Sequence, residues 1–321
     1  MIILNILLLI VGFIALVKGA DIFVEGSSNL AKALKIPTLI IGLTIVAFGT
    51  SAPECAVSVI ASLKGNSDIA IGNVVGSCIC NTLLVLGIAG LFGNLACKKK
   101  IIERDFTYSI LSNIILIIMC SAAIFANNSI KEISRTNGAL LICFLIIYVY
   151  SLLMDAKNTI RNNKEKNKEE TLYKLTFKDI LFIILGLIGI VGGGELVVNN
   201  ATSIAKIIGI SDRVIALTVV AVGTSLPEIV TSVIAVKKGE NDIALGNVIG
   251  SNIFNIFMIL GLSSIAKPLT YTLDSYIDMI IMLAASILVF VLFSIKKKLS
   301  KKECIVLLIL YIAYIGYLMI R

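Results

Sequence analysis

Ten long apolar segments alternate with short polar ones along the chain. Each is close to the roughly 20 mostly apolar residues that a helix needs to cross the core of a bilayer. Seven of them carry no charge: 1–17, 69–97, 106–130, 136–154, 243–266, 279–295 and 304–320. Three are interrupted by one carboxylate each: 36–63, 180–205 and 214–236. The pattern predicts an all-α polytopic membrane protein with ten transmembrane helices.

The polar interruptions belong to an internal repeat. Residues 42–81 and 216–255 are identical at 25 of 40 positions when they are aligned at an offset of 174 residues. Each half of the chain contributes five spans, and five is odd, so the second half must enter the bilayer from the opposite side. Inverted repeats of this kind are typical of secondary transporters, with a binding site near the midplane at the repeat interface. We therefore predict three parts: a first repeat at 1–157, a cytoplasmic linker at 158–175 and a second repeat at 176–321.

A glycine and a proline precede a carboxylate in each repeat. The motif reads GTSAPE up to Glu54 and GTSLPE up to Glu228. Glycine weakens a helix and proline removes a backbone donor, so we expect a broken helix at both sites. The break should free backbone carbonyls near Ala47 and Ala221. The candidate hydroxyl ligands beside the carboxylates are Thr50, Ser51, Thr224 and Ser225.

The next span in each repeat carries amides and a hydroxyl at helical spacing. The first stripe is Asn73, Ser77 and Asn81, and the second is Asn247, Ser251 and Asn255. We predict that Ser77, Ser251, Asn81 and Asn255 are ligands. For Asn73 and Asn247 the spacing leaves two roles open, ion ligation and hydrogen bonding between helices.

Composition limits the chemistry that these residues can do. Hydrophobic residues make up 58% of the chain and charged ones 15%, against about 25% charged residues in soluble domains. There is no histidine, which excludes histidine metal sites and a Ser-His-Asp triad. We expect no enzyme activity, no cofactor and no obligatory protein partner, and we expect the seven cysteines to serve mainly in packing.

Basic residues predict the orientation. With the N-terminus outside, inward loops would hold 21 of the 28 lysines and arginines. Loops on the cytoplasmic side are enriched in these residues, so both termini should lie outside the cell and the central linker in the cytoplasm. We expect the membrane to be a prokaryotic plasma membrane. The net charge of +8 then serves orientation and contact with anionic lipid headgroups, and no nucleic-acid partner is expected.

The candidate site offers only oxygen ligands. Carboxylates, hydroxyls, amides and carbonyls suit Ca²⁺ and Na⁺, and no basic residue lies within either motif to hold an anion. Charged residues at span ends have simpler predicted roles. We expect Asp68 and Asp242 to cap helices. For Asp21, Glu25 and Glu195 we favour membrane anchoring, with a gating role as the open alternative, and Lys32 and Lys206 are also expected to be anchors.

The motifs GTSAPE…GNVVGSCICN and GTSLPE…GNVIGSNIFN resemble the two repeats of the cation/Ca²⁺ exchanger superfamily, and most closely those of its prokaryotic sodium/calcium exchangers. With the ten-span layout, the resemblance covers essentially the whole chain. It implies that the first and sixth spans move as a gate across a fixed eight-helix core. It implies these ion-site residues: Ala47, Thr50, Ser51, Glu54, Ser77, Asn81, Ala221, Thr224, Ser225, Glu228, Ser251 and Asn255. Several relatives carry Asp at the position of Asn255, and because a carboxylate there is associated with K⁺, we expect no K⁺ cotransport.

The resemblance implies an antiporter that exchanges Na⁺ for Ca²⁺. A Ca²⁺/H⁺ exchanger could use the same two glutamates, although paired hydroxyls and carbonyls favour sodium. An intramembrane lipid-phosphate phosphatase would need an arginine or histidine that neither motif has, and a passive channel would not move Ca²⁺ uphill.

Overall fold

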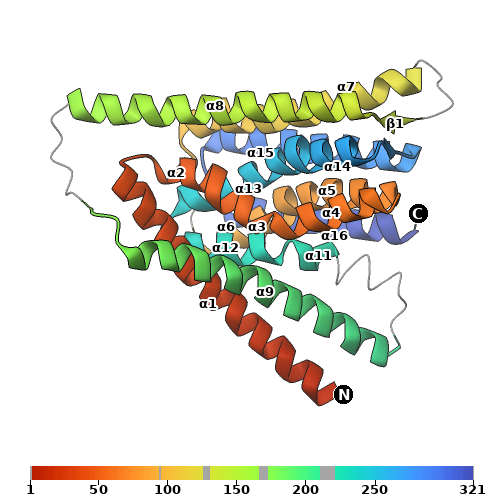
Figure 1. Ribbon diagram of the computed structural model, residues 1–321, viewed down its shortest axis with the longest axis horizontal. Helices are drawn as coiled ribbons and strands as arrows, with labels where there is room; N and C mark the ends of the chain where they lie inside the picture. Colours follow the sequence, from red (N-terminus) through yellow and green to blue (C-terminus); the bar gives the residue numbers. More distant parts are fainter. Residues whose placement is uncertain (1, 94, 126–130, 166–172, 210–220, 321) are drawn as a thin grey trace.

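The computed structural model describes residues 2–93, 95–125, 131–165, 173–209 and 221–320. Within these ranges the chain folds into long helices whose axes are roughly aligned, except that α1 and α9 are tilted relative to the others (Figure 1). The elements of the first half are α1 (Ile2–Leu34), α2 (Thr38–Ile41), η1 (Gly42–Val46), α3 (Ala47–Thr50), α4 (Ala52–Leu63), α5 (Ser67–Ile79), η2 (Cys80–Val85), α6 (Leu86–Phe92), η3 (Ile101–Phe106), α7 (Thr107–Phe125), β1 (Glu132–Ile133) and α8 (Arg135–Glu165). Those of the second half are α9 (Phe177–Ile207), α11 (Ala221–Thr224), α12 (Leu226–Lys237), α13 (Asn241–Phe254), η5 (Asn255–Leu260), α14 (Gly261–Ala266), β2 (Leu269–Thr270), α15 (Leu273–Lys296) and α16 (Lys301–Ile320). The elements named η are π-helices.

The lengths and apolar character of these helices are those of a membrane protein. Among the described residues, seven helices are long and apolar enough to cross a bilayer, and the bent pair on either side of Ser51 makes an eighth. The predicted all-helical membrane class is therefore confirmed, with one small exception, the antiparallel pair β1 and β2. The predicted spans at α7 and at α11–α12 border residues outside the described ranges, and the count of ten stays a prediction.

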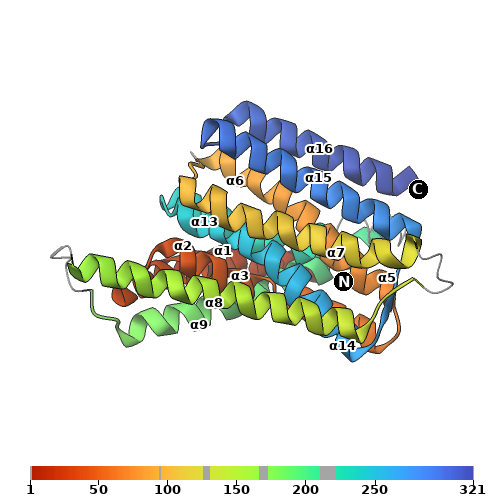
Figure 2. The same cartoon turned by 90° about the horizontal axis from the view of Figure 1, so that it is seen from above.

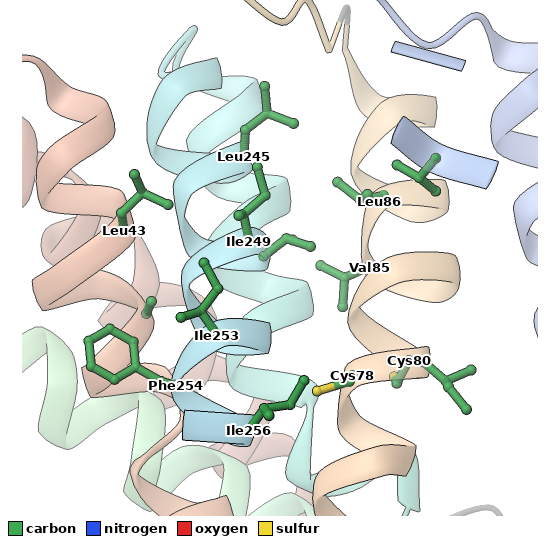
Figure 3. Packing of buried hydrophobic residues seen from close by; sticks show 14 of the residues in the cluster. Leu43, Cys78, Cys80, Val85, Leu86, Leu245, Ile249, Ile253, Phe254 and Ile256 are labelled. Atoms are coloured by element: carbon green, nitrogen blue, oxygen red, sulfur yellow. The ribbon is translucent and has the colours of Figure 1, made fainter. Parts of the chain in front are cut away.

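The helix that contains α13 lies at the centre of the molecule. Its most apolar window, within 241–266, is 89% buried, whereas the corresponding windows of α1 and α8 are each 17% buried. Neighbouring helices therefore enclose α13, whereas the exposed apolar faces of α1 and α8 are suited to contact with lipid. Figure 3 shows Leu245, Ile249 and Ile253 of α13 between Leu43 on one side and Val85 on the other. Seen from above, α13 lies between α15 and α16 on one side and α8 and α9 on the other (Figure 2).

A glycine seam joins α1 to α9 in antiparallel directions. A Cβ built on Gly19 would lie 2.8 Å from the carbonyl oxygen of Gly186, and one on Gly193 would lie 2.8 Å from that of Gly12. No side chain other than hydrogen fits such backbone contact, which is how small residues bring membrane helices together. Positions 12 and 186 are related by the offset of 174 residues, as are 19 and 193, so the two contacts are equivalent in the two halves.

The helices α5 and α13 meet at another pair of equivalent positions. Cys78 on α5 donates a hydrogen bond from Sγ to the backbone oxygen of Asn252 on α13, at 3.7 Å. Residues 78 and 252 are related by the same offset, so each lies against its own counterpart. The amide of Asn252 also donates to the hydroxyl of Thr82, at 2.9 Å.

The two ends of the molecule carry different parts of the chain. The start of α1 and the end of α16 lie at one end, together with β1, whereas the end of α8 and the start of α9 lie at the other (Figure 1). The helix α8 continues to Glu165 and so enters the predicted linker, and α9 begins at Phe177 after a capping box formed by Thr176 and Asp179. The domain boundaries at 157 and 175 stay predictions.

Candidate cation-binding site

Both motifs interrupt their helices, as predicted. Ser51 has φ −84° and ψ 7°, and the helices on either side of it meet at a bend of 49°. Ser225 has φ −89° and ψ 4° and separates α11 from α12. Pro53 and Pro227 lie in the first turn after each break, where a missing N–H costs no helical hydrogen bond.

The two carboxylates lie at the starts of the half-helices and are buried. Glu54 is in the first turn of α4 and Glu228 in the first turn of α12, where the helix dipole favours negative charge. Each residue is 1% exposed, and the two carboxylates are near enough to repel each other. Neither forms an ion pair in the described part of the chain. Buried charges without a partner are costly, so this arrangement favours a bound cation.

Serines from both repeats donate to one oxygen of Glu228. The hydroxyl of Ser51 donates to Oε1 at 3.0 Å, and that of Ser251 donates to the same oxygen at 3.5 Å. The first bond joins the broken helix of one repeat to that of the other. The predicted ligands therefore come together across the interface between the halves.

Asn73 and Asn247 hold the two glutamate turns in equivalent ways. The amide of Asn73 donates to the Glu54 carbonyl at 3.2 Å and to the Ser58 hydroxyl at 2.9 Å. The amide of Asn247 donates to the Glu228 carbonyl at 3.4 Å and to Ser232 at 3.0 Å. Of the two roles left open by the sequence, hydrogen bonding between helices is the one observed.

Ser58 and Ser232 are not among the residues predicted for the site. The signal was present, because both serines are identical at the repeat offset and both follow their glutamate by four residues. Thr50, a predicted ligand, also bonds to this framework, since its hydroxyl donates to Oδ1 of Asn247 at 2.9 Å.

Several buried polar atoms at the site have no hydrogen-bond partner among the described residues. They are Glu54 Oε1 and Oε2, Glu228 Oε2, Asn81 Oδ1, Asn255 Oδ1 and Nδ2, and Ser225 Oγ. Asn255 lies beside Cys78 of α5, and Ser225 lies beside Cys80 at the start of the π-helix that follows α5. Buried polar groups are nearly always satisfied, so these six oxygens are the candidates for binding a cation.

Asn81 and Asn255 lie in the π-helices that follow α5 and α13. The stripe of residues predicted for a regular α-helix therefore ends in a widened turn at its last member. Such turns are frequent at functional sites, where they redirect a side chain that an α-helix would place elsewhere.

The carbonyl of Ala47 is not freed by the break, contrary to the prediction. The break falls at Ser51, whose N–H still bonds to Ala47 at 3.1 Å, and the Ser251 hydroxyl also donates to this carbonyl at 3.4 Å. Ala221 begins α11, next to residues that lie outside the described ranges. Its carbonyl as a ligand stays a prediction.

Ser77 and Thr224 line a cavity of about 500 Å³ along α5. Ser77 also lies beside the Glu54 carboxylate. The lining is mostly apolar, from residues such as Ile69 and Val75, and it includes Asp68 near the start of α5. The cavity therefore extends from two predicted ligands, Ser77 and Thr224, to the start of α5.

The capping roles predicted for Asp68 and Asp242 are wrong. The helices begin one residue earlier, at Ser67 and Asn241, and the cap residues before them make no side-chain capping bond. Asp242 instead pairs with Lys98, at 2.5 Å. The described residues contain no group of three or more His, Cys, Asp or Glu that could hold a metal ion, so a cation here must rely on neutral oxygens beside the two glutamates.

Comparisons with known proteins agree with this chemistry. The model of the sodium/calcium exchanger protein family matches residues 4–154 and 178–320. The sodium/calcium exchanger MaX1 of Methanosarcina acetivorans is 35% identical over 98% of both chains, and the putative antiporter CaxA of Alkalimonas amylolytica is 36% identical over 96% of this chain and 95% of its own. The solved sodium/calcium exchanger from Methanococcus jannaschii superposes with a TM-score of 0.83, at 33% identity, over 98% of this chain and 99% of its own.

These relatives are exchangers rather than enzymes, and they match this chain over nearly its whole length. Together with the apolar helices, they make the chain a multi-pass membrane antiporter for Ca²⁺ and other cations. The chain belongs to the sodium/calcium exchanger family, as a prokaryotic member of the cation/Ca²⁺ exchanger superfamily.

Proposed function

We propose that this protein exchanges Na⁺ for Ca²⁺ by alternating access to a midplane site built around Glu54 and Glu228. The observation that carries the proposal is the pair of carboxylates, each 1% exposed, among unpartnered oxygens. Two negative charges neutralise one Ca²⁺. The same charges with neutral hydroxyl and amide oxygens also suit Na⁺, so the two ions compete for one site.

The proposed ligand set combines both repeats. Glu54 and Glu228 supply charge, and the unpartnered Asn81, Asn255 and Ser225 supply neutral oxygens. The hydroxyls that now bond within the protein would present their oxygen lone pairs to the ion, because the hydroxyl hydrogen can rotate away from it. The remaining members are Thr50, Ser51, Thr224, Ser77, Ser251 and the carbonyl of Ala221.

The proposal includes ten spans in two inverted repeats. Three sets of equivalent contacts support it: the glycine contacts of α1 with α9, the Cys78–Asn252 contact, and the amide bonds of Asn73 and Asn247. A contact between two equivalent positions is expected on a two-fold axis. Alternating access would then occur when each half of the chain adopts the conformation that the other half had before.

The moving part in this proposal is the α1–α9 pair. Its glycine seam holds the two helices together, and their outer surfaces are largely apolar and exposed to lipid. We place both termini outside and the linker inside. The end of α8 and the start of α9 lie opposite both termini, as this orientation requires (Figure 1). The choice between this orientation and its reverse rests on the excess of lysine and arginine in the inward loops.

The test is ⁴⁵Ca²⁺ flux in proteoliposomes with imposed gradients. We expect uphill Ca²⁺ movement when a Na⁺ gradient alone is present, and no response to K⁺. Uphill flux that follows a pH gradient and ignores Na⁺ would establish Ca²⁺/H⁺ exchange instead. Flux that never runs uphill would indicate a passive channel.

A further inference from the structure

A cluster of charged residues ties α1 to the turn between α12 and α13. The Lys238 ammonium lies 3.0 Å from the Asp21 carboxylate and 3.4 Å from that of Glu25, and it donates to the Asp21 backbone oxygen at 2.8 Å. One turn farther along α1, the Ser28 hydroxyl donates to the Glu240 carboxylate at 2.5 Å. We name these five residues the first latch.

The repeat offset leads from the first latch to an equivalent set of residues. Lys64 corresponds to Lys238 and Glu195 to Asp21, so an oppositely charged pair is retained. Thr202 corresponds to Ser28, which retains a hydroxyl. The other two counterparts are amides: Asn199 for Glu25 and Asn66 for Glu240. We name this set the second latch.

The second latch is not formed. Lys64 and Glu195 are both exposed, and neither has an ion-pair partner among the residues that the structure describes. The Thr202 hydroxyl oxygen is buried without a hydrogen-bond partner. The halves of the chain therefore differ here, although the residues needed for the same contacts are present in both.

The two latches lie at opposite ends of the molecule. Asn29, next to the first latch, donates to Asp179 at the start of α9, which is the end that carries the linker. Ser67, close to Lys64, accepts a hydrogen bond from Thr270 of β2, and the partner strand β1 lies at the end that carries both termini (Figure 1).

We propose that the two latches form alternately, each holding the α1–α9 pair against the core while the site opens at the opposite end. This inference rests on the alternating access proposed above. Lys238 and Lys64 then act as positioning residues for the transport cycle, through the moving helices rather than through the ion.

The latches differ in strength. The first has two carboxylates around its lysine and a bond between a serine and a carboxylate, whereas the second has one carboxylate and two amides in those places. Charged hydrogen bonds are stronger than neutral ones, so the first latch is the more stable. In the protein at rest the first latch should therefore be formed, as it is in this structure.

Cross-linking measures the two states separately. The parent protein for these experiments has its two incompletely buried cysteines, Cys55 and Cys143, changed to serine. One variant of this parent carries D21C with K238C, and another carries K64C with E195C. We expect a short bifunctional thiol reagent to cross-link each pair in membranes and each cross-link to stop exchange reversibly. If the K64C/E195C pair never cross-links while the parent exchanges Ca²⁺ for Na⁺, the latch proposal fails. A parent without such exchange contradicts the proposed function instead.

Charge changes test whether the first latch opposes the second. Adding D21N and E25Q to the K64C/E195C variant should raise its cross-linking rate about three- to tenfold, since two partly exposed ion pairs are lost. The matched control is E103Q, which removes an ion pair with Lys99 that does not involve α1 and should leave the rate unchanged. In this same variant, D21K should also raise the rate, and adding K238D to D21K should return it to the starting value. No change with D21N and E25Q, or no return with K238D, would overturn the proposal.

Discussion

Glu54 and Glu228 are equivalent in sequence but not in their hydrogen bonding. Glu228 accepts bonds from Ser51 and Ser251 through one oxygen, whereas neither carboxylate oxygen of Glu54 has a hydrogen-bond partner in the part of the chain that the structure describes. A cation that enters the site therefore meets one carboxylate already held by hydroxyls and one that must be ordered by the ion. Both charges are needed, because a divalent ion loses most of its hydration when it binds.

Removal of either charge should abolish transport. We expect Glu54→Gln and Glu228→Gln each to lower Na⁺-driven Ca²⁺ flux by about 100-fold or more, the equivalent of ~3 kcal/mol for the loss of one partner from a buried charge pair. Gln keeps the shape of the side chain, so thermal stability in detergent should change little. Wild-type flux in either variant would exclude the two-carboxylate site.

Asn255 offers a test of the neutral ligands. Asn255→Asp would place a third carboxylate beside Glu54 and Glu228, and the repulsion among them would favour binding of a proton that competes with cations. We expect Ca²⁺ uptake by this variant to fall more steeply than in the wild type as the pH decreases from 8.5 to 6, and to become sensitive to K⁺.

The matched variant Asn255→Ala removes an oxygen and adds no charge. We expect weaker Ca²⁺ binding with the pH profile of the wild type. Identical pH profiles and affinities in wild type and both variants would place Asn255 away from the ions.

The sequence predicts the positions of the helix breaks better than it predicts the local structure around them. Glycine and proline act on the backbone locally, so the interruptions at Ser51 and Ser225 follow from the motifs alone. Whether the Ala47 carbonyl is free depends on which backbone N–H loses its helical hydrogen bond at the break. The formation of the π-helix at Asn255 depends on packing against neighbouring helices. Neither follows from local residue chemistry.

Positions on α9 provide a prediction about helix packing. A Cβ on Gly193 would lie 2.6 Å from the backbone nitrogen of Leu16, whereas one on the adjacent Gly192 meets no atom of the described residues within 4 Å. We expect Gly193→Ala to destabilise the protein by about 1–3 kcal/mol and to slow exchange, because α1 must move away from α9. Thermal unfolding in detergent and Ca²⁺ flux measure the two effects.

Gly192→Ala is the control from the same turn of the helix. It should leave stability and flux within error of the wild type. Equal effects of the two substitutions would show that helix propensity, rather than the seam, decides the outcome at this place.

At the scale of the whole molecule, hydrophobic periodicity predicts the membrane class and the repeat predicts which residues meet. The glutamates, 174 residues apart, come together because the repeats pack face to face. The difference between the two halves could not be predicted, because an oppositely charged pair is present at equivalent positions in both. Lys238 is paired and Lys64 is not, in the conformation that the structure describes.

The orientation in the membrane gives a prediction at this scale. Thr270 and Lys302 are both exposed, at opposite ends of the molecule. In intact cells, a membrane-impermeant maleimide should label Thr270→Cys and should label Lys302→Cys only after the cells are opened. The reverse pattern would place both termini inside.

The contact between Cys78 and Asn252 bears on how such a protein can evolve. Two identical five-helix subunits would have to place the same side chain on both sides of their symmetry axis. A fused gene is released from this rule, so a thiol can face an amide, and the amide can bond to Thr82 on one side only. Fusion thus lets mutation favour one conformation over its mirror counterpart, which gives a transporter built from duplicated halves a preferred direction in which to wait for its ion.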